Sequence, residues 1–85
     1  MKVRILYFAS LREALGVDRE EIALPAHVTS AGALRAWLRE RGAQWEQALA
    51  QSRAVRVAVN QQMANEHTPI VAGAEIAFFP PVTGG

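Results

Sequence analysis

The residues most suited to chemistry lie at the end of the sequence, which reads Phe78-Phe79-Pro80-Pro81-Val82-Thr83-Gly84-Gly85. Two prolines lower the conformational entropy of an extended arm and project it from a folded domain. Glycines let a backbone enter a channel that is too narrow for any Cβ atom. Such an arm would present a terminal carboxylate, which ATP can adenylate to an acyl electrophile and a sulfur nucleophile can then convert to a thiocarboxylate.

The rest of the sequence offers few groups for catalysis or metal binding. Cysteine is absent, which excludes disulfides, thiolate nucleophiles and Cys-ligated zinc or iron–sulfur sites. His27 and His67 are too few for a His-based metal site and are predicted to lie on the surface. Glu20 and Glu21 are adjacent on a predicted strand, so their carboxylates point to opposite faces and are interpreted as ordinary surface charge. Residues 39–41 (Arg-Glu-Arg) are interpreted as a solvated helix end.

The composition predicts one small folded domain. The 85 residues are 51% hydrophobic and 20% charged, which argues against disorder and leaves no room for a second domain. Nine basic and eight acidic residues, scattered along the sequence, do not favour nucleic acid as a partner. No segment approaches the ~20 apolar residues of a membrane span, and the apolar run near the start is too short for a signal peptide. We therefore predict a cytoplasmic protein without a membrane partner.

Hydrophobic spacing and turn residues predict a mixture of strands and helices. Strands are expected at residues 2–9, 19–24, 54–59 and 75–79, helices at residues 10–16 and 30–41 with a shorter helical segment near 45–49, and a turn at residues 60–61. Ser10 is expected to cap the first helix, and Thr29 or Ser30 the second. Gly16 and Gly42 are expected to end these two helices.

This order of elements predicts an α+β fold in which one main helix covers one face of a mixed sheet. The first and last strands are both long and hydrophobic, so we place them side by side at the centre. That arrangement is the β-grasp, or ubiquitin-like, fold, with a domain at residues 1–79 and a flexible, extended C-terminal tail at residues 80–85. Trp37 and Trp45 fall on helical apolar stripes and are predicted to lie in the core.

Two aromatic side chains are predicted to lie on the uncovered face of this sheet. In the first strand Tyr7 and the residues two and four before it face the core, so Phe8 points away from the helices. In the last strand Phe79 lies on the face opposite Phe78. Exposed aromatic patches mark interfaces, so Phe8 and Phe79 are candidate partner contacts. A twist or bulge that buries both rings is the alternative. Arg12 either pairs with an acidic group of the partner or carries plain surface charge.

The whole sequence resembles the MoaD family, the small sulfur-carrier subunits of molybdopterin synthase. The terminal octapeptide at residues 78–85 matches the motif of that family without a mismatch and is highly specific. The segments at residues 3–9 and 57–61 are weaker matches. Gln61 stands where relatives often have Gly, and residues 72–74 lack the acidic residues that often flank the glycine there. Both departures lie in turns and leave the tail unchanged.

The resemblance implies a mechanism centred on Gly85. An E1-like adenylating enzyme would activate its carboxylate with ATP, and a sulfur donor system would install a thiocarboxylate. The tail would enter the large subunit of the synthase and donate sulfur to cyclic pyranopterin monophosphate in molybdenum cofactor biosynthesis. The residues implied to insert are Pro80, Pro81, Val82, Thr83 and Gly84. The chain would bind no cofactor or metal itself, and would be a co-substrate within a heterotetramer whose large subunits supply the catalytic groups.

Three other functions stay open at this point. A ThiS-like carrier of thiazole sulfur for thiamin has the same fold and the same Gly-Gly end, although the second helical segment and the Phe-Phe-Pro-Pro-Val lead-in favour the molybdopterin carrier. A ubiquitin-type modifier would join Gly85 to lysines of target proteins. A non-reactive β-grasp interaction module would keep its activity after removal of Gly84 and Gly85, whereas a carrier or modifier would lose it.

Overall fold

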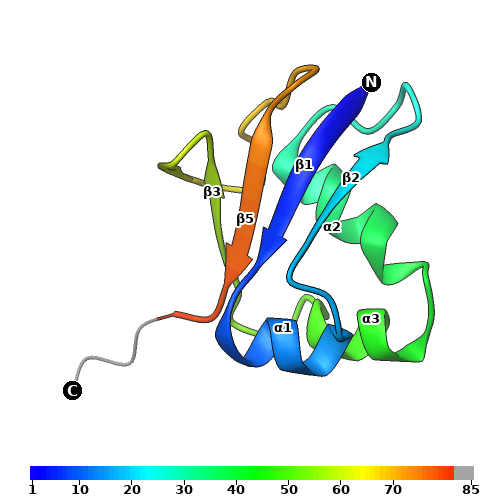
Figure 1. Ribbon diagram of the computed structural model, residues 1–85, viewed down its shortest axis with the longest axis vertical. Helices are drawn as coiled ribbons and strands as arrows, with labels where there is room; N and C mark the ends of the chain where they lie inside the picture. Colours follow the sequence, from blue (N-terminus) through cyan, green and yellow to red (C-terminus); the bar gives the residue numbers. More distant parts are fainter. Residues whose placement is uncertain (82–85) are drawn as a thin grey trace.

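The computed structural model describes residues 1–81. Its elements follow the chain in the order β1 (Lys2–Tyr7), α1 (Ala9–Leu15), β2 (Arg19–Ala23), α2 (Ala31–Arg39), α3 (Ala43–Ala48), β3 (Arg56–Val59), β4 (Gln62–Ala64) and β5 (Glu75–Phe79). The strands form one five-stranded sheet in the order β2-β1-β5-β3-β4. Strands β1 and β5 are parallel and lie side by side (Figure 1), whereas the other neighbouring pairs are antiparallel. The predicted mixed sheet of a β-grasp fold, with the first and last strands paired inside it, is confirmed.

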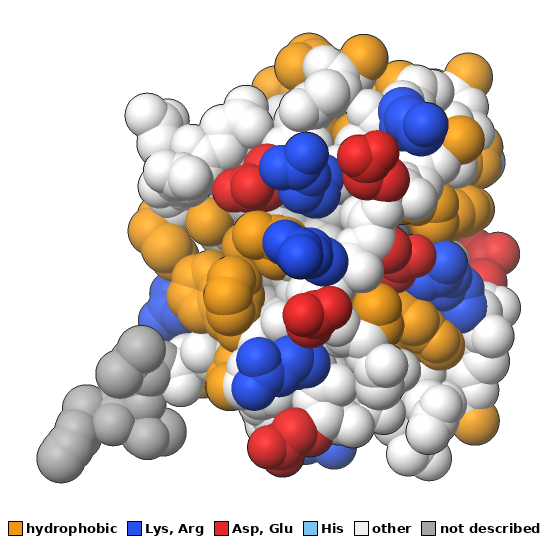
Figure 2. All heavy atoms as spheres, viewed as in Figure 1, with side chains coloured by type: hydrophobic (Ala, Val, Ile, Leu, Met, Phe, Trp, Pro, Cys, Tyr) orange, Lys and Arg blue, Asp and Glu red, His pale blue; other side chains and the backbone are white. Residues whose placement is uncertain are grey.

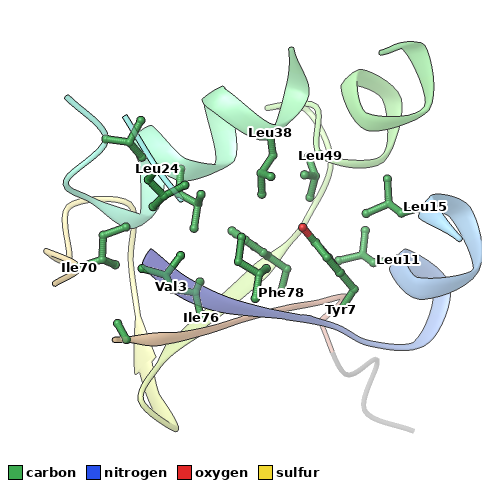
Figure 3. Packing of buried hydrophobic residues seen from close by; sticks show 14 of the residues in the cluster. Val3, Tyr7, Leu11, Leu15, Leu24, Leu38, Leu49, Ile70, Ile76 and Phe78 are labelled. Carbon is green, nitrogen blue, oxygen red and sulfur yellow. The ribbon is translucent and has the colours of Figure 1, made fainter. Parts of the chain in front are cut away.

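The core lies between the sheet and the helices. Along β1, Val3, Ile5 and Tyr7 are only 2%, 0% and 1% exposed, which confirms the predicted alternation of this strand. Along β5, Ile76 and Phe78 are buried in the same way. Figure 3 shows Val3, Tyr7, Ile76 and Phe78 pointing from the strands toward leucines of the helix layer. Burial of each large aliphatic or aromatic side chain contributes roughly 1.5–3 kcal/mol, so these two strands hold the sheet against the helix layer.

The main helix, α2, begins as its sequence predicts but ends earlier. The Oγ atom of Ser30 accepts a hydrogen bond from the backbone N–H of Ala33 at 3.2 Å, so Ser30 is the N-cap. The prediction that Gly42 ends this helix is wrong. The helix ends at Arg39 with Glu40 as its C-cap, and Gly42, with φ +149°, is the N-cap of α3 instead. Only residues 40–42 separate the two helices, so the glycine lies directly before the first residue of α3.

The short helix α1 also departs from its predicted cap. Its N-cap is Phe8, which makes no side-chain capping bond, and Ser10 lies inside the helix. The backbone N–H groups of Leu11 and Arg12 both donate to the carbonyl of Phe8, which moves the first turn to a point before the serine. At the other end, Gly16 has φ +73° and donates to the carbonyl of Arg12, so the predicted end of this helix is confirmed.

One strand, β4, has no counterpart among the sequence predictions. The predicted turn is present, because Asn60 and Gln61 have φ values of +51° and +67°. Two successive positive φ values are typical of the tight turns that join antiparallel strands. Strand β4 then pairs with β3 over three residue pairs. The sequence does not predict this strand, because three residues are too few to display a period of two.

Candidate functional site

The face of the sheet away from the helices carries a row of mainly apolar side chains. The strand registers place Arg19 of β2, Leu6 of β1, Ala77 of β5, Ala58 of β3 and Met63 of β4 opposite one another in turn. Residues directly opposite one another in a sheet lie on the same face. The row therefore crosses all five strands, with an arginine at one end and Met63, which is 63% exposed, at the other.

A second row lies nearer to the end of β5. The N–H of Phe8 donates to the carbonyl of Phe78 at 3.1 Å, which continues the pairing of β1 with β5 by one residue and sets Phe8 beside Phe79. Phe8 is 46% exposed, and Phe79 is partly buried. Phe79 in turn pairs with Arg56 of β3. The registers therefore place both phenylalanines on the uncovered face, and their contact with a partner stays a prediction.

Together the apolar members of the two rows make one surface, which we call the open-face patch. Its members are Leu6, Phe8, Ala58, Met63, Ala77 and Phe79. Figure 2 shows hydrophobic side chains gathered over β3 and the lower part of β5, beside a column of alternating basic and acidic groups. Phe8 and Met63 are the exposed members of the patch and the other four are partly buried, which makes the patch a candidate interaction surface.

A third row, farther from the end of β5, is charged. Arg4 lies opposite Glu21 of β2 and opposite Glu75 of β5. Its Nη1 atom is 4.0 Å from Oε1 of Glu75. Glu75 is thus the ion-pair partner of this arginine, and the row of one guanidinium and two carboxylates forms a polar border of the open-face patch on the side away from the tail.

The tail begins at the corner where the open-face patch ends. Strand β5 stops at Phe79, and Pro80 and Pro81 follow as partly buried residues. Proline has no N–H to donate to a ladder, which ends the strand there. The remaining predicted tail residues, Val82, Thr83, Gly84 and Gly85, lie outside the described residues.

Beneath the patch, on the covered face, a polar cluster joins four elements. The Tyr7 hydroxyl donates to Oε2 of Glu20 at 2.8 Å. Arg41 donates to both carboxylate oxygens of Glu20 at 2.8 and 2.9 Å. The guanidinium of Arg41 lies 4.5 Å above the ring of Trp45, and that ring meets Tyr7 edge-on at 5.6 Å. Tyr7 also stacks on Phe78 at 6.3 Å, so the cluster supports the end of β5 from below.

The cluster fixes the protonation state of its members. Burial, followed by the hydrogen bond to Glu20, raises the pKa of Tyr7 far above its ordinary value. Partial burial works to raise the pKa of Glu20, but hydrogen bonds from Arg41 and Tyr7 outweigh it and lower that pKa below its ordinary value. At neutral pH the tyrosine therefore donates as a neutral hydroxyl and the glutamate accepts as a carboxylate.

This cluster corrects two interpretations of the sequence. Glu20 and Glu21 do point to opposite faces, but Glu20 accepts hydrogen bonds from Tyr7 and Arg41 and is not ordinary surface charge. Arg41 is not part of a freely solvated helix end, because its guanidinium donates hydrogen bonds to both carboxylate oxygens of Glu20. The sequence holds one signal for this role of Glu20, because strand alternation places it on the same, covered face of β2 as Ile22.

The other candidate residues lie apart from the patch or at its margin. Arg12 is exposed on α1, close in sequence to Phe8, and its pairing with a partner stays a prediction. Trp37 and Trp45 pack against the core from its edge and are partly buried, so they do not lie inside it as predicted. His27 is exposed, and His67 lies 3.4 Å from Glu66 on the surface.

Residues 1–81 hold neither a candidate metal site nor a membrane-spanning helix. Within that range no three potential His, Cys, Asp or Glu ligands gather into a group that could hold a metal ion. None of the helices described there has both the length and the apolar character needed to cross a bilayer.

Comparison with known proteins places the chain in a family. The family described as the ThiS family matches residues 5–85. The chain belongs to the ThiS family. Within it the chain is 39% identical over 83 residues to the molybdopterin synthase sulfur carrier subunit of Escherichia coli K12, covering 98% of this chain and 99% of that one. It is 41% identical to the corresponding subunit of Haemophilus influenzae, with the same coverage. These relatives confirm the resemblance to the MoaD family.

Solved structures agree with this placement. A chain of the protein–protein complex of subunits 1 and 2 of the molybdopterin-converting factor from Helicobacter pylori is 26% identical, with a TM-score of 0.65 and full coverage of both chains. SAMP1 from Haloferax volcanii has a TM-score of 0.75 at 23% identity, also with full coverage. The second likeness supports the fold alone.

Proposed function

We propose that this protein is the sulfur carrier subunit of molybdopterin synthase and acts in molybdenum cofactor biosynthesis. The observation that carries this proposal is the identity of 39% and 41%, over 98% of the chain, to two sulfur carrier subunits of that enzyme. The family match extends to residue 85 and so includes the Gly84-Gly85 pair. Its proposed place is the cytoplasm.

The proposed chemistry takes place at the carboxylate of Gly85. An E1-like adenylating enzyme transfers AMP from ATP to this carboxylate and releases pyrophosphate. A sulfur donor system then displaces AMP and leaves a thiocarboxylate. In the large subunit the sulfur passes to cyclic pyranopterin monophosphate, and water restores the carboxylate. The carrier is therefore the small subunit of a synthase complex and a co-substrate, with the catalytic groups on the large subunit.

The geometry of residues 1–81 supports a carrier that docks on a partner and presents its tail to it. The open-face patch ends where Pro80 and Pro81 leave the sheet, so a partner that covers the patch would lie next to the start of the tail. A rigid contact beside a narrow arm fixes the direction in which the arm enters the partner, which reduces the entropy lost when the reacting group is positioned. In the complex from Helicobacter pylori, subunit 1 of the molybdopterin-converting factor is joined to subunit 2.

A mass spectrum of the C-terminal peptide tests the proposal. The protein is incubated with ATP, an E1-like enzyme and a sulfur donor, and then with the large subunit and cyclic pyranopterin monophosphate. We expect one oxygen of Gly85 to be exchanged for sulfur, and the sulfur to be lost again only when the large subunit and its substrate are added. A chain without Gly85 is the control.

Each alternative function gives a different result in the same experiment. A thiocarboxylate that forms but is not consumed by the large subunit would favour the thiazole carrier. Attachment of Gly85 to lysines without sulfur exchange would favour a protein modifier. An unchanged Gly85, while the same enzyme charges a known carrier, would favour a non-reactive interaction module.

A further inference from the structure

Two arginines flank the open-face patch from opposite sides. Arg19 of β2 lies opposite Leu6 and ends the apolar row at one edge of the sheet. Arg56 of β3 lies opposite Phe79, beside the start of the tail. Both side chains are exposed and, by strand alternation, lie on the face that carries the patch.

Within residues 1–81 neither of these arginines has a carboxylate within ion-pair distance. Four of the six other arginines are engaged by groups of the chain itself, three of them by carboxylates: Arg4 by Glu75, Arg39 by Glu46 and Arg41 by Glu20. Arg35 donates to backbone carbonyls at the end of α3. The positive charge of Arg19 and Arg56 is thus left facing outward, next to apolar surface.

The sheet fixes the spacing of the two charges. Arg19 and Arg56 belong to β2 and β3, which are separated by β1 and β5. Three steps between neighbouring strands span about 14 Å, and the rows of Arg19 and Arg56 are two residues apart along the strands, so the two Cα atoms lie roughly 16 Å apart. The apolar members Leu6, Ala77 and Phe79 lie between them. Any surface that covers the patch must therefore meet a positive charge on either side of an apolar strip.

We propose that Arg19 and Arg56 select a partner surface in which an apolar strip is flanked by two acidic groups roughly 16 Å apart. The inference rests on the proposed function, because it takes the large subunit of molybdopterin synthase as that partner. An uncharged or basic surface of the same shape would leave two arginines desolvated without partners, which costs binding energy. Arg4 on the neighbouring charged row already has Glu75 as its ion-pair partner and adds little to this selection.

Exposed charges at the rim of an interface act mainly on the rate of association. They attract the partner over a Debye length of about 10 Å at 0.1 M salt, and higher salt screens the attraction. The contacts in the centre of an interface instead set the rate of dissociation. Arg19 and Arg56 should therefore speed docking in a salt-dependent way, whereas Phe79 should slow release.

The test measures association and dissociation rates of the full chain with the large subunit by surface plasmon resonance, at about 0.03 M and about 0.5 M NaCl. Three variants each remove one positive charge: Arg19→Gln, Arg56→Gln and, as a control on the helix side of the molecule, Arg39→Gln. We expect the first two to slow association about 2–5-fold at low salt, and the pair combined about 5–20-fold, with the rates converging at high salt. Arg39→Gln should associate like the parent chain. The double variant with lysine at both positions should recover most of the rate.

The outcomes separate this inference from the proposed function. If the parent chain binds the large subunit but the double glutamine variant associates at the parent rate at low salt, the flanking role of the arginines is refuted and the proposed function stands. The same holds if Arg39→Gln slows association equally, because the effect would then be one of net charge alone. If the parent chain does not bind the large subunit at either salt concentration, the proposed function fails and this inference fails with it.

Discussion

Glu20 should stabilise the fold far more than its neighbour Glu21, although both are glutamates of β2. Replacement of Glu20 by alanine removes the acceptor of the Tyr7 hydroxyl and the two-pronged partner of Arg41. A hydrogen bond to a charged group contributes about 1.5–3 kcal/mol, and a buried hydroxyl left without a partner adds a desolvation cost. We expect Glu20→Ala to lower the free energy of unfolding by about 2–4 kcal/mol.

Urea and thermal unfolding measure this loss. In a domain of this size each kcal/mol lowers Tm by about 4–8 °C. The matched control is Glu21→Ala, which acts on the open face and should stay within about 0.5 kcal/mol of the parent. A second control is Tyr7→Phe, in which the hydroxyl no longer needs an acceptor. In that background Glu20→Ala should cost less, because the two side chains are coupled.

The pH dependence of stability follows from the same contacts. The pKa of Glu20 is lowered in the folded state, so its contribution is present above its unfolded pKa of about 4.3 and is lost as the pH falls through the folded value. The pKa of Tyr7 is raised, so stability declines as the pH rises above the unfolded tyrosine pKa of about 10. Equal losses for Glu20→Ala and Glu21→Ala at pH 7 would refute the assignment of a stabilising role to the cluster.

Three further predictions concern the tail, the patch and the β3–β4 turn. Removal of Gly85, or addition of one residue after it, should abolish sulfur delivery with little change in Tm; a large fall in Tm would show that the end of the chain packs on the domain. Phe79→Ala should weaken binding to the large subunit about 30-fold or more while it lowers stability by only about 1–2 kcal/mol, and a greater loss in folding than in binding would make Phe79 a core residue. Gln61→Gly should raise the free energy of unfolding by about 0.5–1 kcal/mol, because φ is +67° at this position and glycine adopts such values without strain; unchanged or lower stability in thermal unfolding would contradict this.

The parts of the fold that the sequence predicts are those with a strong local period. Alternation in β1 separates Tyr7 from Phe8 correctly, because six residues of one strand repeat the pattern. The serine cap of α2 and the glycine end of α1 are also local, since each depends on a bond to a residue three or four positions away. The placement of Phe8 and Phe79 on one open face then follows from the pairing of β1 with β5.

The parts that could not be predicted depend on contacts between distant segments. The choice of Phe8 rather than Ser10 as the N-cap of α1 follows from the turn by which the chain leaves the sheet. The hydrogen bonds between Arg41 and Glu20 join two segments that lie 21 positions apart in the sequence, and no local periodicity predicts such a contact. The sequence also does not show which arginines form ion pairs within the chain and which, like Arg19, have a charge that faces outward. That difference depends on which strands become neighbours.

The adjacent residues Tyr7 and Phe8 lie on opposite faces of the sheet and have different roles. Tyr7 is 1% exposed and joins the covered cluster that holds the sheet to the helices, whereas Phe8 is 46% exposed and belongs to the surface offered to a partner. Side chains in a strand alternate with a period of two, so a shift of one residue exchanges the two faces. An insertion between Leu6 and Tyr7 would therefore turn the tyrosine onto the open face and move Phe8 from its place beside Phe79, and it would impair folding and docking together. Stability and partner recognition are thus fixed by one register, that of β1 against β5.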